Sequence, residues 1–260
     1  MLHHWEEPII SGGENDTGSG TIFFAGCNLK CIYCQNYDIS NSCEGKTLST
    51  QDLVEVFNDF ENKGALNINL VTPTHYTKQI IDALSIYKPK IPVVWNSSGY
   101  EKASEIAKLK DLVDIYLVDL KYMDKNLAQE LSFAPDYPEI ATNCILQMKE
   151  NHPKDVIVNG IMQKGVIVRH LVLPNCVENS FLCLDWIKSK LGKDQIISIM
   201  SQYIPCYKAK DNDKINRKLH KIEYKRVLAH LEKLGLDNGF VQEMDSADKC
   251  YTPDFSKYED

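Results

Sequence analysis

Three closely spaced cysteines in the segment FFAGCNLKCIYCQN are the residues of this chain best suited to chemistry. Cys27, Cys31 and Cys34 are separated by three and then two residues, directly after a short apolar run. A four-iron, four-sulfur cluster normally takes four cysteines. Three cysteines would therefore leave one iron open to bind a further ligand, much as a catalytic zinc site keeps one position free.

The chain has nine cysteines, and this odd number, with no recognisable export signal, indicates a reduced compartment rather than a disulfide framework. The cysteines outside the loop form no close pair, so we expect them to be buried as small apolar side chains: Cys43, Cys144, Cys176, Cys183, Cys206 and Cys250. Structural zinc is the alternative use of the loop. It requires a fourth ligand, for which the nearest candidates are Cys43 and the distant His75.

Composition argues against several classes of function. The 260 residues carry a formal net charge of −7, and phosphate binding requires clustered Lys and Arg, so we expect no nucleic-acid partner. No apolar run reaches the roughly 18 residues that a membrane span needs. The N-terminal stretch MLHHWEEPII lacks the basic start and apolar middle of a signal peptide. The sequence therefore predicts a cytoplasmic protein without a membrane partner.

Short apolar runs alternate with amphipathic stretches along the chain. The expected strands cover residues 21–25, 67–71, 92–97, 114–120, 166–174 and 196–200. Helical periodicity lies between them, and such alternation predicts a parallel sheet with right-handed crossovers. About six βα units are too few for a closed eight-stranded barrel, so we predict an α/β fold with a partial (β/α)6, TIM-like barrel.

No repeat, low-complexity tract or linker divides the chain, and we expect a single domain over residues 1–260. An N-terminal extension would cover residues 1–20, and the barrel core would cover residues 21–200. Residues 201–260 would form a C-terminal helix and a tail that folds across the barrel mouth.

Polar segments follow the expected strands at their carboxyl ends, the edge of a parallel sheet where functional residues collect. They are TPTHY, NSSGY, DLKY, RHLVLPN and MSQY. The cysteine loop follows the first strand and so projects from the same edge. We therefore expect one mouth, in which Lys121 and Arg169 could pair with a carboxylate and Met200 could lie beside a purine.

The cysteine loop, with Tyr33 before its last cysteine, resembles the signature of the radical S-adenosylmethionine (SAM) superfamily. Within it, GSGTIFFAGCNLKCIYCQN is similar to the activating enzymes of glycyl radical enzymes, pyruvate formate-lyase activase among them. The segments HHWEEPIISG, NLVTPTHY and NSSGYE are more similar still to uncharacterised relatives of those enzymes. The resemblance runs from about residue 3 to the end of the chain.

This resemblance implies a [4Fe-4S] cluster held by the three cysteines, with the amino and carboxylate groups of SAM on the open iron. Tyr33 would lie against the adenine. The Gly-Gly-Glu segment that many members use for the SAM amino group is absent, so Thr72 and Thr74, or their backbone carbonyls, would replace it. Asn96 and Ser98 correspond to the polar pair that meets the ribose and carboxylate.

Four further positions follow from the same resemblance. Asp119 and Lys121, in the segment DLK, would hold the methionyl part of SAM. Arg169 stands at the strand position that faces the cofactor in activases, and Tyr203 stands where activases have a histidine. Activases carry Gly-Pro-Gly near the N-terminus, where this chain reads Gly18-Ser19-Gly20.

The implied activity is reductive cleavage of SAM to methionine and a 5′-deoxyadenosyl radical that abstracts hydrogen from a substrate. A one-electron donor such as flavodoxin or ferredoxin would be a partner. The hydrogen could come from the backbone glycine of a glycyl radical protein. Alternatively, the enzyme modifies a small molecule or peptide beneath a mouth covered by its own chain. A non-catalytic iron–sulfur or zinc-binding protein is the third possibility.

Overall fold

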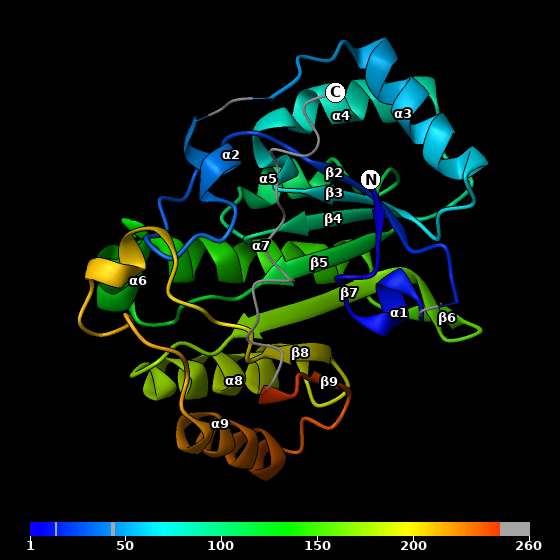
Figure 1. Ribbon diagram of the computed structural model, residues 1–260. Coiled ribbons are helices and arrows are strands. Elements are labelled where there is room, and N and C mark those ends of the chain that lie inside the picture. The colour runs from blue at the N-terminus through cyan, green and yellow to red at the C-terminus, as the bar shows by residue number, and fades with distance from the viewer. Residues whose placement is uncertain (14, 43–44, 245–260) are drawn as a thin grey trace.

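The computed structural model describes residues 1–13, 15–42 and 45–244, and the strands of this part of the chain form one continuous sheet (Figure 1). The strand order is β1-β2-β3-β4-β5-β7-β8-β9, and β6 pairs with β7 beside this path. The strands are β1 (Leu2–His3), β2 (Ser19–Phe23), β3 (Ile68–Val71), β4 (Val93–Ser97), β5 (Ile115–Asp119), β6 (Val156–Val158), β7 (Ile161–Leu171), β8 (Ile196–Met200) and β9 (Gly239–Val241).

Most of the chain between these strands is helical. The α-helices are α1 (Pro8–Ser11), α2 (Tyr37–Ser42), α3 (Thr50–Asn62), α4 (Thr77–Ile86), α5 (Ala103–Ala107), α6 (Lys125–Ser132), α7 (Tyr137–Asn151), α8 (Val177–Leu191) and α9 (Lys221–Leu234). Two 3-10 helices, η1 (Pro73–Tyr76) and η2 (Tyr207–Asp211), follow β3 and β8.

The sheet is parallel from β2 to β9, and only its additions at β1 and β6 are antiparallel. Parallel neighbours need long crossovers, which the helices between the strands provide. The two ends of the order, β1 and β9, do not pair with each other, so the barrel stays open. The six predicted strands and the partial barrel are confirmed. Strands β1, β6 and β9 were not predicted, because two or three residues show no alternation.

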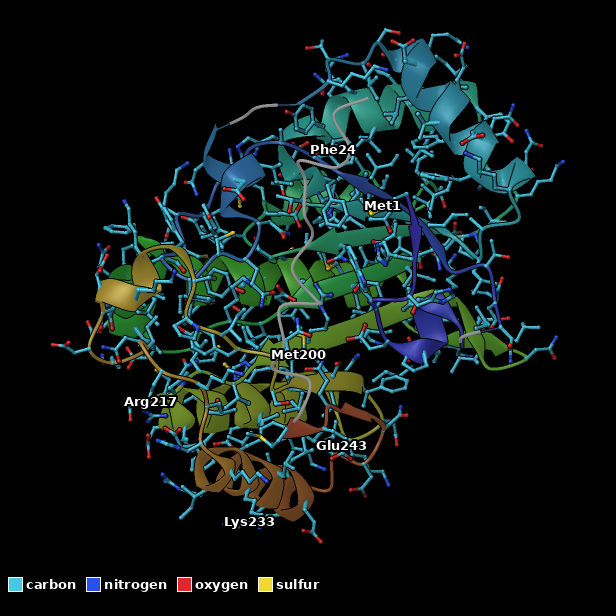
Figure 2. All side chains as sticks on the ribbon, viewed as in Figure 1. Met1, Phe24, Met200, Arg217, Lys233 and Glu243 are labelled. Carbon is cyan, nitrogen blue, oxygen red and sulfur yellow. The ribbon has the colours of Figure 1, made fainter. Side chains whose placement is uncertain are left out.

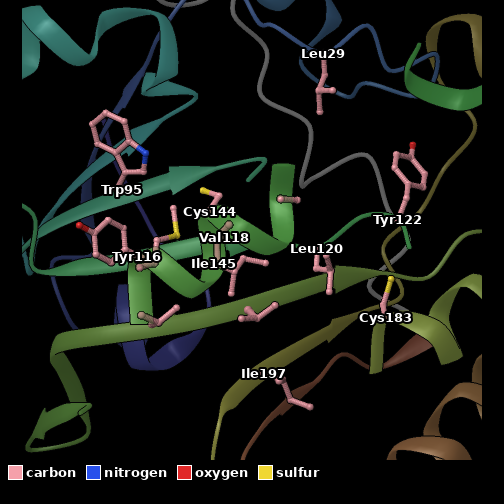
Figure 3. Packing of buried hydrophobic residues seen from close by; sticks show 14 of the residues in the cluster. Leu29, Trp95, Tyr116, Val118, Leu120, Tyr122, Cys144, Ile145, Cys183 and Ile197 are labelled. Atoms are coloured by element: carbon pink, nitrogen blue, oxygen red, sulfur yellow. The ribbon is translucent and has the colours of Figure 1, made fainter. Parts of the chain in front are cut away.

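One face of the sheet packs against the crossover helices (Figure 3). Trp95 of β4 and Tyr116 of β5 are fully buried in this large cluster, together with Cys144 of α7. The sheet and helices approach closely: a Cβ on Gly20 of β2 would lie 2.5 Å from the Phe60 ring of α3. Glycine is therefore required at this position of β2.

The other face of the sheet carries a smaller apolar cluster made by the alternate strand residues and by the N-terminal segment. The buried members are Ile9, Ile10, Val94, Ile115, Leu117, Met162, Ile167 and Ile196. Asn67 Nδ2 donates a 2.7 Å hydrogen bond to the carbonyl of Ile10, which fixes α1 over the strand starts. The chain thus crosses the inner face of its own sheet before entering β2 (Figure 1).

Local sequence signals explain where the main helices begin and end. Ser49 caps α3 and forms a reciprocal capping box with Asp52. Helix α6 spans Lys125–Ser132, and Asp124 caps its first turn. Gly235 ends α9 in the left-handed conformation that glycine adopts without strain.

Several expectations concern residues outside the described ranges. They include the predicted covering tail beyond Met244, together with Cys43 and Cys250. Among the described cysteines, the predicted burial is confirmed for Cys144, Cys176 and Cys183, whereas Cys206 is only partly buried. In the ranges described, we find no helix with the length and apolar character needed to cross a membrane.

Candidate active site

The cysteine loop connects β2 to α2 and is held from two sides. On one side, the amide of Ile32 donates to the carbonyl of Leu131 at 2.9 Å, which docks the loop onto the last turn of α6. On the other side, the hydroxyl of Tyr76 donates to the carbonyl of Ala25 at 3.0 Å. The loop that carries the three thiols is therefore fixed by contacts from distant segments.

All three loop cysteines are free and partly buried. Burial raises the pKa of the Cys31 thiol to about 12 and also raises the pKa of Cys27. The ammonium of Lys121 lies close enough to oppose both shifts. Without metal the Cys27 and Cys31 thiols are thus protonated, and metal binding must displace their protons.

These cysteines fit an iron–sulfur cluster better than a single ion. Within the described ranges, no three His, Cys, Asp or Glu side chains converge closely enough to hold one metal ion. In a four-iron cluster each cysteine binds a different iron, so the sulfurs need not converge. Cys27, Cys31 and Cys34 are the residues that would hold the cluster, beside the cationic Lys121.

A second segment, which follows β8, clamps the cysteine loop. The thiol of Cys206 lies 3.3 Å from the carbonyl oxygen of Tyr33 and 3.5 Å from that of Cys34. The rings of Tyr33 and Tyr203 meet edge to face, with centroids 6.1 Å apart, and Tyr207 stacks on Tyr37 at 5.0 Å. Sequence reasoning missed this clamp, since no spacing connects Cys206 with a loop 172 residues earlier.

Tyr203 belongs to the clamp through its ring, and its hydroxyl has another partner. That hydroxyl donates to the carbonyl of Ile215, and the side chain is 1% exposed. The other apolar candidate, Met200, ends β8 and is 8% exposed (Figure 2). A contact of either residue with SAM remains a prediction.

Four charged side chains form one network at the carboxyl ends of β5 and β7. Asp119 Oδ1 accepts a 2.8 Å hydrogen bond from Arg169 Nε, and its Oδ2 lies 2.6 Å from Lys121 Nζ. Arg169 Nη1 donates to Glu6 Oε2 at 3.0 Å. The network therefore unites three predicted site residues with one carboxylate from the N-terminal segment.

Two amide side chains complete this network. Arg169 Nη2 donates to Asn96 Oδ1 at 2.6 Å, so Asn96 lies beside the predicted arginine. Glu6 Oε1 accepts from Asn96 Nδ2 at 3.1 Å and from Asn69 Nδ2 at 3.0 Å. Sequence reasoning missed Glu6 and Asn69. Asn69 could have been found, because its position in β3 has the same parity as the inward-facing Val71.

Burial and charge pairing act in opposite directions on the carboxyls of the network. Burial raises the pKa of Glu6, although Arg169 works against this shift. Burial would also raise the pKa of Asp119, but Arg169 and Lys121 hold it below its ordinary value. Asp119 is therefore ionised and can balance a cationic group, while Arg169 and Lys121 are suited to a carboxylate.

The remaining polar candidates divide between two sides of the sheet. The Thr74 hydroxyl donates to the Glu101 carboxyl at 2.9 Å. This buried carboxyl also accepts from Ser97 and Trp95. The Thr74 hydroxyl is thus used on the helix side, away from Arg169. Ser98 is partly exposed, and its carbonyl accepts a 2.8 Å hydrogen bond from Tyr137.

Thr72, which follows β3 and precedes η1, has an unusual backbone conformation. Its φ of 59° and ψ of 48° are left-handed, a region that costs a β-branched residue roughly 1–2 kcal/mol. Its amide donates to the Asn96 carbonyl at 2.9 Å, so the turn is fixed beside the charged network. Strain of this kind is often found at binding sites, which keeps Thr72 a candidate for SAM.

Comparison with known proteins decides the family. The radical SAM superfamily profile matches residues 21–171, which contain the cysteine loop and strands β3 to β5 and β7. The chain belongs to the radical SAM superfamily. Its cofactors are accordingly a [4Fe-4S] cluster, as the cysteine spacing indicated, and SAM, as the resemblance implied.

Two relatives of this radical SAM protein differ in the share of the chain that they match and in whether their activity is named. An uncharacterized protein of Methanocaldococcus jannaschii is 34% identical over 250 residues, which cover 91% of this chain and 67% of the relative. A pyruvate formate-lyase-activating enzyme of Clostridium pasteurianum is 31% identical over 111 residues, or 40% of this chain and 45% of that enzyme. The likeness to an enzyme of named activity thus spans less than half of either protein.

Solved structures agree on the radical SAM fold. Methylornithine synthase (PylB) aligns with a TM-score of 0.56 at 14% identity, covering 86% of this chain and 70% of the synthase. Streptococcus suis SuiB bound to S-adenosylmethionine aligns with a TM-score of 0.54 at 15% identity, covering 92% of this chain and 52% of SuiB. HydG, a maturase of the [FeFe]-hydrogenase, aligns with a TM-score of 0.57 at 15% identity, covering 90% of this chain and 53% of HydG. The chain spans about half the length of SuiB and HydG.

Proposed function

We propose that this protein cleaves SAM reductively and removes a hydrogen atom from a small molecule or a peptide bound in the barrel mouth. When bound, the cofactors would supply one-electron cleavage of the sulfonium S–C bond, with methionine as one product. Transfer of a hydrogen atom from the substrate would then give 5′-deoxyadenosine and a substrate radical. The electron comes from a donor of the flavodoxin or ferredoxin type. The hydrogen atom that the substrate loses is the one that 5′-deoxyadenosine gains.

The position of the N-terminal segment is the observation that supports a small molecule or a peptide as the substrate. Ile9 and Ile10 pack on the inner face of the sheet, and Glu6 reaches Arg169 at 3.0 Å. The protein therefore closes its barrel interior with apolar groups on the side of the strand starts and brings Glu6 to the charged network. A covered interior excludes water from a reactive site and suits a ligand that the chain encloses.

The charged network supplies binding groups for the amino-acid end of SAM. Lys121 and Arg169 can each donate to a carboxylate, Arg169 through two nitrogen atoms. Asp119 can accept from an ammonium group because its pKa is held below the ordinary value. The cysteine loop lies on the same edge of the sheet, so these groups can bind SAM next to the open iron.

The proposal is tested with anaerobically reconstituted protein, SAM and a chemical reductant. We expect 5′-deoxyadenosine and methionine in equal amounts, and faster formation when the low-mass fraction of an extract from the source cells is added. A protein that binds SAM but releases neither product would contradict radical cleavage. Stimulation only by the macromolecular fraction would contradict a small substrate.

An activase of a glycyl radical enzyme is the second candidate, favoured by the likeness to the Clostridium enzyme. Such an enzyme would need a partner protein that acquires an organic radical. Electron paramagnetic resonance (EPR) of the mixture of both proteins, SAM and reductant separates the two proposals. A radical signal that remains on the isolated partner would establish the activase.

A further inference from the structure

A chain of three buried hydroxyl groups ends on the sulfur of Cys31. Ser132 Oγ lies 3.0 Å from Cys31 Sγ. The Tyr122 hydroxyl lies 2.7 Å from Ser132 Oγ and 2.6 Å from the hydroxyl of Tyr33. Ser132, Tyr122 and Tyr33 are 1%, 0% and 7% exposed, so water does not compete for these bonds.

The chain has one direction when Cys31 is a cluster ligand. A ligand thiolate carries no proton, so Ser132 must donate its only hydroxyl proton to the sulfur. Tyr122 must then donate to Ser132, and Tyr33 must donate to Tyr122. All three O–H dipoles thus point their positive ends towards Cys31, and bonds aligned in this way strengthen one another.

Backbone contacts keep the donor next to the sulfur. The last turn of α6 is bound to the cysteine loop on both sides of Cys31, through Lys30 N to the Ser132 carbonyl at 3.4 Å and Ile32 N to the Leu131 carbonyl at 2.9 Å. Ser132 therefore cannot move away from Cys31 without releasing the loop. The bond between them is a built feature of the α6–loop junction.

We propose that Ser132, supported by Tyr122 and Tyr33, raises the reduction potential of the cluster through the Cys31 sulfur. Reduction adds negative charge to the cluster, and hydrogen bonds to its sulfurs stabilise the reduced form. A higher potential lets the electron donor reduce the cluster more readily and lowers the driving force for passing the electron on to the sulfonium ligand. Ser132 acts here as a positioning residue that touches a cluster ligand.

The test is an EPR-monitored redox titration of the reconstituted cluster, without SAM. Ser132→Ala should lower the midpoint potential. We expect a roughly three- to tenfold smaller ratio of reduced to oxidised cluster at a fixed applied potential, tenfold being about 59 mV for one electron. Tyr122→Phe should lower the potential less, because Ser132 still donates. Ser132→Thr, which keeps the hydroxyl, should restore the original value.

Matched controls remove buried hydroxyls elsewhere. Ser180→Ala deletes a helix hydroxyl that bonds His170 at 2.9 Å, and Tyr224→Phe deletes a buried phenol that bonds the Ile199 carbonyl at 3.0 Å. Neither should change the potential. A cluster of full iron content with an unchanged potential in Ser132→Ala would overturn the proposal. If the Ser132→Ala variant loses its cluster, an unchanged potential in Tyr122→Phe would overturn the proposed effect of the hydroxyl chain.

This inference rests on the cluster and on Cys31 as its ligand, and not on the substrate of the proposed function. The potential is measured in the absence of SAM and substrate. A failure of SAM cleavage would leave the predicted shift intact, and an absent shift would leave SAM cleavage intact. The two proposals therefore fail separately.

Discussion

Glu6 and Arg169, which are 163 residues apart in the chain, form an ion pair of 3.0 Å inside the open barrel. Both side chains are almost buried, with 12% and 13% of their side-chain surface exposed. Arg169 also donates to Asp119, so the N-terminal segment is bound directly to a predicted SAM-binding group. The segment before β2 therefore contributes a side chain to the candidate site.

Replacing Glu6 tests this connection. Glu6→Ala removes one partner of a buried ion pair and leaves Asn69 and Asn96 without their acceptor, so we expect a loss of about 3–5 kcal/mol in the free energy of unfolding. Glu6→Gln keeps one acceptor oxygen and should cost less. Both variants should also release 5′-deoxyadenosine faster without substrate, because the interior is less well covered. Urea unfolding and chromatography of the nucleoside measure the two effects.

The control for Glu6 is its neighbour. Glu7→Gln makes the same charge change, but in the described structure Glu7 acts on Arg169 through its charge and forms no hydrogen bond with Arg169, Asn69 or Asn96. Equal destabilisation of the Glu6→Gln and Glu7→Gln variants would show that net charge, rather than the contact with Arg169, is responsible.

The cysteine loop gives the second prediction. Alanine at Cys27, Cys31 or Cys34 should abolish cluster binding, because two thiolates cannot hold the four-iron group. Cys206→Ala is the matched control, since the hydrogen bonds of this thiol to the loop go to backbone carbonyl oxygens. We expect about four irons per chain in the wild type and in Cys206→Ala. Loss of iron in Cys206→Ala with retention in a loop variant would overturn the assignment of ligands.

The sequence predicted those parts of the site that stand at strand ends. Asn96, Asp119 and Arg169 all occupy inward positions at the carboxyl ends of parallel strands, and such ends meet by topology alone. The six main strands were predictable for a related reason. Each is an apolar run long enough to show its period and is bounded by polar or breaker residues.

Contacts set by tertiary packing could not be predicted in this way. Glu6 reaches Arg169 because α1 crosses the sheet, and nothing in the local sequence specifies that path. The bond from the Thr74 hydroxyl to Glu101 depends on a 3-10 turn after β3, and a contact of the Thr74 carbonyl with SAM stays a prediction. The chain of hydroxyls on Cys31 likewise joins Tyr33, Tyr122 and Ser132 through contacts across 89 and 101 residues of sequence.

The charged network gives the third prediction. Lys121→Ala should weaken SAM binding roughly ten- to a hundredfold, the range for loss of one charged hydrogen bond of about 1.5–3 kcal/mol. Asp119→Ala should do the same and should also destabilise the fold, because Lys121 and Arg169 both pair with Asp119. Iron content should stay unchanged in both. Calorimetric titration of the reconstituted protein with SAM measures the affinity, and wild-type affinity in both variants would make these residues structural.

His170, the neighbour of Arg169, lies on the opposite face of β7 and provides a pH-dependent test of the fold. Its Nδ1 lies 2.7 Å from the Leu120 carbonyl and its Nε2 lies 2.9 Å from Ser180 Oγ. Nδ1 donates to the carbonyl oxygen, and in the neutral ring Nε2 accepts from the Ser180 hydroxyl. Burial lowers the pKa of His170 to about 4, from an ordinary value near 6.5.

The sign of the pH effect follows from that lowered pKa. Above about pH 6.5 the ring is neutral in both states, and its contribution to stability is fully present. As the pH falls towards about 4, the ring binds a proton in the unfolded chain but stays neutral in the folded chain. The free energy of unfolding therefore falls by up to about 1.4 kcal/mol per pH unit, which amounts to roughly 3 kcal/mol over the whole range. His170→Gln cannot titrate and should lose less stability over the same range. Urea unfolding at about pH 7.5, 6 and 5 measures the difference. Ser180→Ala keeps the buried ring and should retain the wild-type slope, whereas parallel curves for wild type and His170→Gln would show that the ring takes up its proton in the folded state.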